Sequence, residues 1–175
     1  MKAHSSIPDR TEAAEYYFTY IDKVGSGDIR AIIRAQQAET VSFLESIDDA
    51  KSLYRYEPGK WSVREVVSHI NDAERVFVFR ALWFARGFDT PLPSFDQLIA
   101  ISAADADKRE WTDHIEEFRA IRGSTISFFD SLPDEAWGRR GVASGNEFTV
   151  RALAYIVAGH VAHHASVIRA KYLGR

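Results

Sequence analysis

The sequence predicts an all-α fold, in which four long helices form a bundle with one long crossover connection. Apolar residues recur at every third or fourth position over long stretches, which is the helical period, and they do not alternate as in strands. Glycine and proline cluster between these stretches. A chain of 175 residues can complete one hydrophobic core. We therefore expect a single domain over residues 1–175, with an N-terminal arm at 1–27 and the bundle at 28–175.

Caps and apolar spacing predict the first helices. A short helix over residues 11–23 forms the arm and ends at a Gly-Ser-Gly turn. Asp28 can cap a longer helix that runs to about Asp48, the first helix of the bundle. Ser62 and Glu65 have the spacing of a capping box, so the second bundle helix is expected to begin there and to run to about residue 87.

The second half of the chain contains the crossover and two more helices. Residues 88–101 include two prolines and cannot continue the second helix, so this segment is expected to be the long crossover. Ser102 and Asp105 indicate the start of the third bundle helix, which stops before a proline at 133.

The last segment before the fourth helix is expected to be a loop. Residues 134–146 are polar and rich in glycine. Thr149 can then cap a final helix that runs to Leu173, with a glycine directly beyond it.

Composition excludes several kinds of site. Lys and Arg number 22 against 25 Asp and Glu, a net charge of −3, so nucleic-acid binding is not expected without a local basic patch. The absence of cysteine removes disulfides, thiolate nucleophiles and cysteine-type zinc sites, and leaves His, Asp and Glu as the strong metal ligands. No segment has the apolar length of a membrane span or of a leader. We expect a cytoplasmic protein with no membrane partner.

Two histidines interrupt an apolar row on the last predicted helix. Leu153, Val157, His160 and His164 follow one another by three or four residues, the spacing of a buried seam. At about 100° per residue, His164 lies about 40° from His160 on the side of that row, whereas His163 lies at about −60°. An unpaired buried imidazole costs on the order of 1 to 3 kcal/mol, and a metal ion would supply a partner for both. Two separately hydrogen-bonded histidines are the alternative.

A third ligand must come from another helix. His69 lies at the edge of the apolar stripe of the second helix, where a side chain can face the gap between neighbouring helices. His4 lies in the terminus and His114 at a surface position of the third helix, so both are expected to be solvated. The Glu-x-x-His pattern of di-iron bundles and the HExxH motif are both absent, since Val161 follows His160.

Three charged residues near His69 are candidates for catalysis. Asp72 or Glu74 could be a fourth ligand, a partner for an imidazole N–H or a general base, and the alternative is a solvated helix face. Arg80 lies on the same edge as His69 and could hold a carboxylate or a phosphate. The more common role of a lone arginine is a surface salt bridge.

Two motifs resemble those of the DinB-like superfamily, also called the DinB/YfiT group. The first is Pro-Gly-Lys-Trp-Ser-Val-Arg-Glu-Val over residues 58–66, followed by His69, and the second is Gly-His-Val-Ala-His-His over 159–164. The resemblance covers nearly the whole chain. It implies a four-helix bundle, often dimeric, with one divalent metal ion, nickel or zinc, bound by His69, His160 and His164. It also implies an open coordination position, where water can be deprotonated or displaced by a substrate atom.

The resemblance also implies a class of chemistry. Members with assigned reactions include bacillithiol S-transferases and a mycothiol-dependent maleylpyruvate isomerase, in which the metal activates a low-molecular-weight thiol. A metal-dependent S-transferase or hydrolase with a small-molecule substrate is therefore expected. The alternatives are a non-enzymatic metal-binding or stress-response protein, in which the ion ties helices together, and a helical interaction domain without metal. Four Trp, seven Tyr and eleven Phe are more aromatic residues than one small bundle need bury, which favours a homodimer.

Overall fold

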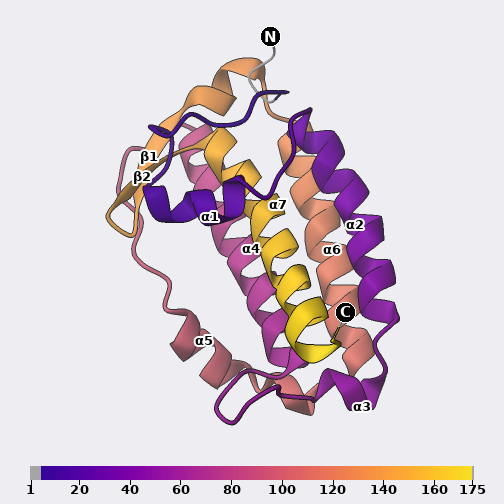
Figure 1. Ribbon diagram of the computed structural model, residues 1–175. Helices are drawn as coiled ribbons and strands as arrows, with labels where there is room; N and C mark the ends of the chain where they lie inside the picture. The colour runs from indigo at the N-terminus through magenta and orange to yellow at the C-terminus, as the bar shows by residue number, and fades with distance from the viewer. Residues whose placement is uncertain (1–4, 175) are drawn as a thin grey trace.

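Four long helices pack side by side in the computed structural model, which describes residues 5–174 (Figure 1). This arrangement confirms the predicted helical bundle. The four helices are α2 (Ile29–Glu45), α4 (Val63–Ala85), α6 (Trp111–Asp130) and α7 (Val150–Val167). The shorter helical elements are Glu15–Tyr17, α1 (Phe18–Ile21), α3 (Asp49–Ser52), α5 (Gln97–Ala104), Ala106–Lys108, Asp134–Gly138 and a π-helical turn at Ile168–Tyr172.

A long crossover at residues 86–110 returns the chain to the end of the bundle where α4 begins. The hydroxyl of Ser62 donates a hydrogen bond to the carboxylate of Asp107 at 2.5 Å, and Arg64 donates to the carbonyl of Asp107 at 3.2 Å. Because α6 begins a few residues after Asp107, α4 and α6 run in the same direction, as Figure 1 shows. The predicted crossover is confirmed.

Two expectations about this connection are wrong. The crossover contains a helix, α5, whose cap Asp96 accepts hydrogen bonds from two backbone N–H groups of the first turn. The third bundle helix begins at Trp111 and not at Ser102 or Asp105. Ser102 lies within α5, and Asp105 ends that helix because it adopts a left-handed φ of 48°.

The predicted caps of three bundle helices are confirmed. Asp28 accepts a hydrogen bond from the second residue of α2. Ser62 and Glu65 form the reciprocal hydrogen bonds of a capping box at α4. Thr149 accepts from the backbone N–H of Ala152 at the start of α7. These side chains satisfy N–H groups that the first turn of a helix leaves unpaired.

A β-hairpin replaces the loop expected before α7. Strands β1 (Arg140–Ala143) and β2 (Asn146–Thr149) pair antiparallel, with Ala143 opposite Asn146. Ser144 and Gly145 form the two-residue turn and have φ angles of 54° and 73°, which are typical of a type I′ turn. The hairpin also holds the crossover, because Leu92 donates to the carbonyl of Val142 at 2.9 Å and accepts from the N–H of Ser144 at 3.1 Å.

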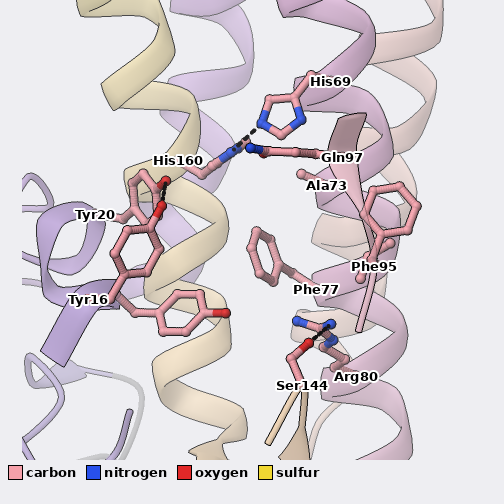
Figure 2. Close-up of a pocket in the computed structure, with 12 residues that line it drawn as sticks. Tyr16, Tyr20, His69, Ala73, Phe77, Arg80, Phe95, Gln97, Ser144 and His160 are labelled. Carbon is pink, nitrogen blue, oxygen red and sulfur yellow. Dashed lines mark hydrogen bonds between the residues drawn. The ribbon is translucent and has the colours of Figure 1, made fainter. Parts of the chain in front are cut away.

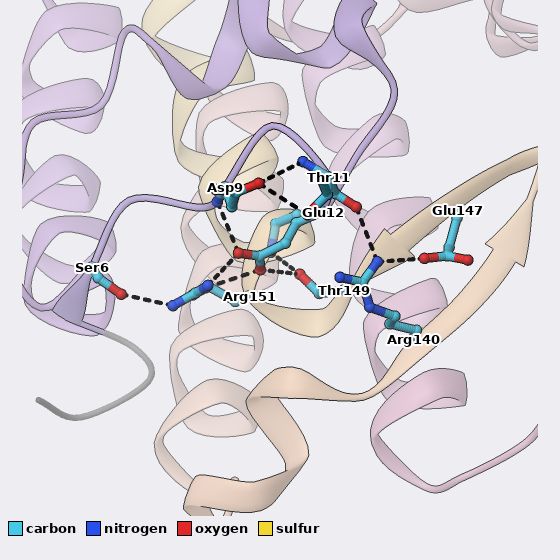
Figure 3. A network of polar contacts seen from close by, with 9 residues as sticks. Ser6, Asp9, Thr11, Glu12, Arg140, Glu147, Thr149 and Arg151 are labelled. Atoms are coloured by element: carbon cyan, nitrogen blue, oxygen red, sulfur yellow. Dashed lines mark hydrogen bonds and ion pairs between the residues drawn. The ribbon is translucent and has the colours of Figure 1, made fainter.

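The N-terminal arm is fastened to the start of α7 by a buried carboxylate (Figure 3). Glu12 accepts hydrogen bonds from the N–H of Asp9 at 2.8 Å and from the hydroxyl of Thr149 at 2.7 Å, and it forms an ion pair with Arg151. Burial would raise the pKa of Glu12, but Arg151 and the two other donors together lower it. The carboxylate therefore stays ionised and paired at neutral pH.

The arm is helical over a shorter stretch than the predicted 11–23, and it crosses α7 at a glycine. A β-carbon at Gly159 would lie 2.1 Å from the carbonyl oxygen of Tyr20, so only glycine permits this approach. The contact sets Tyr20 directly beside His160, the next residue of α7.

Two buried apolar clusters fill the bundle, and their boundary crosses α4 and α7. On α4 the clusters meet between Ile70 and Ala73, and on α7 they meet between Ala158 and Val161. His69 and His160 lie at this boundary. Within residues 5–174, no helix has both the length and the apolar character needed to cross a membrane.

Candidate metal centre

Three histidines converge where the two apolar clusters meet. His69 comes from α4, and His160 and His164 come from α7. The Nε2 atom of His160 lies 3.1 Å from Nε2 of His69 and 3.1 Å from Nε2 of His164. His69 and His160 are buried and His164 is half-buried. Figure 2 shows the His69 and His160 rings pointing toward one another from facing helices.

The spacing of these nitrogens fits a single metal ion. An ion that binds imidazole nitrogens at about 2.0–2.1 Å separates them by about 3.3–3.4 Å in tetrahedral geometry and by about 2.9 Å at right angles. The two observed separations of 3.1 Å lie between these values. The third separation, between His69 and His164, is within 4.8 Å, so a modest movement of one ring would bring all three nitrogens around a single ion.

The three imidazoles are in the protonation state that a metal requires. Burial lowers the pKa of His69 to about 4. Burial, and then the charges of His69 and His163, lower the pKa of His164 to about 3. Burial and the neighbouring imidazoles also hold the pKa of His160 well below its ordinary value. All three rings are thus neutral at pH 7, and each has a nitrogen lone pair available for an ion.

The other described histidines are not members of this group, although the His163 ring packs against the His164 ring with 5.0 Å between centroids. His163 is half-buried on the flank of α7, where its ring packs against Tyr20 with 5.4 Å between centroids. The expectation that His114 is solvated is wrong, because it is fully buried and its Nε2–H donates to the carbonyl of Ala106 at 2.9 Å. His114 thereby ties the end of the crossover to α6. His4 lies outside the described residues.

Neither candidate carboxylate joins the histidine group. The alternative interpretation, that Glu74 lies on a solvated helix face, is wrong, since Glu74 is 2% exposed, forms an ion pair with Arg122 at 2.8 Å and accepts from the Thr125 hydroxyl at 2.7 Å. Burial raises the pKa of Glu74, and Arg122 opposes that rise. Asp72 is half-buried and pairs with Arg75 at 3.3 Å. Both carboxylates are thus engaged by arginines, away from the imidazole nitrogens.

A pocket of about 130 Å³ extends from the histidines to Arg80 (Figure 2). Its walls come from five segments: α4, α7, the N-terminal arm, the crossover and the hairpin turn. The Tyr20 ring packs edge-on against the His160 ring, and the Tyr20 hydroxyl lies 3.0 Å from that of Tyr16. The remaining wall residues are Tyr17, Ala73, Val76, Phe77, Phe95, Gln97 and Ser144.

Arg80 was expected to form a surface salt bridge, and this expectation is wrong. Its side chain is 4% exposed and lies in the pocket. It donates a hydrogen bond to the hydroxyl of Ser144 at 2.8 Å. The sequence does not indicate this contact, because Ser144 lies in the turn of a hairpin that was predicted to be a loop.

A second pocket, of about 210 Å³, reaches the histidines from another side. It is lined by His163 and His164, and by Lys60 and Trp61 from the turn before α4. The Trp61 ring also packs against the His69 ring, with 5.1 Å between centroids. Small molecules can thus approach the group of nitrogens from two directions.

Comparisons with known proteins agree with this architecture. A family model described as the DinB superfamily matches residues 32–168. The structure is similar to that of YfiT from Bacillus subtilis, described as a probable metal-dependent hydrolase with an unusual four-helix bundle topology. The TM-score is 0.71 at 17% identity, over 93% of this chain and 89% of that one. No curated protein matches the chain in sequence.

A second solved structure is that of a mycothiol-dependent maleylpyruvate isomerase. Its TM-score is 0.67 at 14% identity, over 79% of this chain and 58% of that one. The matched region is therefore little more than half of the isomerase. At such identities, both similarities show a shared fold.

Proposed function

Because the chain belongs to the DinB superfamily, we propose that it binds one divalent metal ion through His69, His160 and His164. One observation carries this proposal: three neutral imidazoles from two helices meet in a largely buried site, where Nε2 of His160 lies 3.1 Å from Nε2 of both His69 and His164. Without an ion these nitrogens must share hydrogen bonds among themselves, although each neutral ring has a single N–H donor. Nickel and zinc both suit such a set of ligands.

We further propose that the site is catalytic and activates a low-molecular-weight thiol or a water molecule. A bound ion with one free position would lower the pKa of that ligand and make it a nucleophile near neutral pH. The chain contains no cysteine, so a reacting thiol would come from a cosubstrate. The similarity to a probable hydrolase and to part of a thiol-dependent isomerase supports either reaction class.

The residues around the histidines would support such a reaction by orienting the imidazole rings and by offering a hydrogen-bond donor to a ligand. Tyr20 and Trp61 pack against the His160 and His69 rings and fix their orientation. Burial and the neighbouring Tyr16 raise the pKa of Tyr20, so its hydroxyl stays protonated and can donate a hydrogen bond to a ligand in the pocket.

The competing assignment is an ion that only ties α4 to α7. These helices already pack through an extensive apolar core on both sides of the histidines, so the fold does not need an ion to join them. Two pockets also lead to the nitrogens, an arrangement that a closed structural site would not need.

Cobalt substitution distinguishes the two assignments. We expect the visible absorption spectrum of the cobalt-loaded protein to change when bacillithiol, mycothiol or glutathione is added, because a thiolate enters the coordination sphere. The matched control is the cobalt-loaded protein with an alcohol of similar size. A spectrum that no thiol alters would rule out the thiol transferase. Deprotonation of a cobalt-bound water would change the spectrum with pH. A spectrum that changes neither with thiols nor with pH would therefore favour the structural ion.

A further inference from the structure

We propose that Arg80 is an oxyanion subsite at the end of the pocket opposite the histidines. The molecule that enters this pocket would then be small, with a carboxylate or phosphate at one end and its reacting group at the other. The assignment of the reacting end rests on the proposed function, whereas the anion subsite requires no metal.

Arg80 differs from the other buried arginines in having no carboxylate partner. Three arginines are buried among residues 5–174: Arg64, Arg80 and Arg122. Arg64 pairs with Asp49 at 2.5 Å and Arg122 pairs with Glu74 at 2.8 Å. For Arg80 no carboxylate lies within ion-pair distance in the described part of the chain. A buried charge of this kind is normally paired.

The hydrogen-bonding capacity of Arg80 is also only partly used. A guanidinium has five N–H donors in a planar fork that matches a carboxylate or phosphate. Arg80 donates to Ser144 at 2.8 Å and makes a longer contact of 3.5 Å with the carbonyl of Pro93. The Tyr17 hydroxyl also interacts with it. Donors therefore remain available for a ligand.

Arg80 points into the same pocket as the histidines. It follows His69 by eleven positions on α4, which places the two on nearly the same face of the helix, about 20° apart and roughly 16 Å along its axis. Helical side chains lean toward the N-terminus, so the guanidinium leans toward His69. Figure 2 shows Arg80 at one end of the pocket and the histidines at the other, with Phe77 between them.

The guanidinium is held in place by the hairpin and the crossover. Ser144 adopts a left-handed φ of 54°, a conformation that most residues other than glycine avoid, and its hydroxyl contacts Arg80. The N–H of Ser144 is bonded to the carbonyl of Leu92. Arg80 is therefore fixed before a ligand arrives, which reduces the entropy lost on binding.

The pocket limits the size and character of the ligand. A volume of about 130 Å³ is slightly below that of a cavity of about 150 Å³, which is known to hold benzene. Arg80 carries the only fixed charge among the described residues of the lining, which are otherwise aromatic, apolar or neutral polar. The site thus favours a short organic anion over a polymer or a multiply charged molecule.

A titration of the metal-free protein tests the subsite directly. The probes are hexanoate and propyl phosphate, with hexanol as the neutral control, and the readout is the ¹⁵N resonance of the Arg80 side-chain Nε. We expect a saturable shift with at least one anion and none with hexanol. The hexanoate and phosphate arms show which oxyanion is preferred. If neither anion gives a saturable shift, the proposal is overturned.

Variants assign the binding to Arg80, and their affinities are measured by calorimetric titration because Arg80→Gln and Arg80→Lys lack the Nε resonance. Arg80→Gln should weaken anion affinity roughly ten- to hundredfold, the loss expected for hydrogen bonds to a charged group. Arg80→Lys keeps the charge but loses the fork, so it should retain weaker binding, and it provides the test if Arg80→Gln does not fold. Arg86→Gln, an exposed arginine at the end of α4, is the matched control and should bind as the wild type does. Equal affinity in all of these proteins would refute the subsite.

A second titration separates this proposal from the metal function. A series of ω-mercaptocarboxylates of increasing length is compared with the matching mercaptoalcohols on the cobalt-loaded protein. We expect the carboxylates to bind more tightly at one preferred length, and that preference to vanish in Arg80→Gln. Anion binding to the metal-free protein without any thiol response would leave the subsite standing and remove the thiol function. A thiol response without a preference for carboxylates would remove the subsite.

Discussion

The low pKa of His69 should make the stability of the metal-free protein depend on pH. The folded-state pKa is about 4 and the ordinary value is 6.5, so between these values the unfolded chain binds a proton that the folded chain does not. The free energy of unfolding should therefore be fully retained above pH 6.5 and fall as the pH drops toward 4. The contribution of His69 to this loss is about 3 kcal/mol.

Urea unfolding of the metal-free wild type and of His69→Gln, from pH 8 to pH 4, measures this contribution. The amide of Gln does not titrate, so the unfolding free energy of the variant should fall less steeply in this range. Parallel curves for the two proteins would contradict the assigned pKa.

Glu74 should be important for stability. Glu74→Gln leaves the buried Arg122 without its counter-charge, and the loss of one partner of a buried pair costs about 3–5 kcal/mol. Glu116→Gln is the control, because the Glu116–Arg119 pair is mostly exposed and should contribute about 0–1 kcal/mol. Chemical denaturation gives both values. A loss of activity in Glu74→Gln with unchanged stability would instead make Glu74 a catalytic residue.

At the residue scale, the sequence predicts a side chain's surroundings well only where a periodic row defines them. His160 and His164 interrupt such a row, and helical geometry alone separates them from His163. The assignment of His69 as a ligand depended on the family motif, since a side chain at the edge of the apolar stripe can face either the gap between two helices or solvent. Arg80 and Glu74 could not be placed, because their partners Ser144 and Arg122 come from distant segments.

The contact between α1 and α7 gives a prediction at the scale of elements. Gly159→Ala would place a methyl group against the Tyr20 carbonyl and should push the arm off α7, which would lower the melting temperature and speed proteolysis of the arm. Gly123→Ala in α6 is the matched control, because no atom beyond the neighbouring backbone of its own helix lies within 4 Å of its β-carbon position, and alanine favours helix by about 1 kcal/mol. Similar melting temperatures for Gly159→Ala and the wild type would show that the arm is not held there.

Helices with side-chain caps and long apolar rows could be predicted from the sequence, whereas the short helix α5 and the short hairpin strands could not. Asp28, Ser62 and Thr149 each cap a helix long enough to show the helical period. Helix α5 has only 8 residues, and each hairpin strand has 4, which is too short for a period to be visible. Ser102 and Asp105 resemble a helix start in sequence, but the left-handed backbone at Asp105 ends a helix instead.

The homodimer stays a prediction at the scale of the whole molecule. Leu98 and Ile99 on α5 are 65% and 70% exposed, which is unusual for large apolar side chains unless a second chain covers them. Light scattering on a sizing column should give the mass of two chains for the wild type and of one chain for Leu98→Glu with Ile99→Glu. A wild-type protein that is monomeric at micromolar concentration would contradict the dimer.

The bundle as a whole brings α4 and α7 together so that His69, His160 and His164 meet, and metal content tests this account most directly. Elemental analysis after mild purification and reconstitution should find about one transition-metal ion per chain, as expected for one three-ligand site. His69→Ala, His160→Ala and His164→Ala should each abolish binding, whereas His163→Ala should retain it. A wild type that holds only a small fraction of an equivalent after reconstitution would contradict the metal centre, as would an equal loss in His163→Ala.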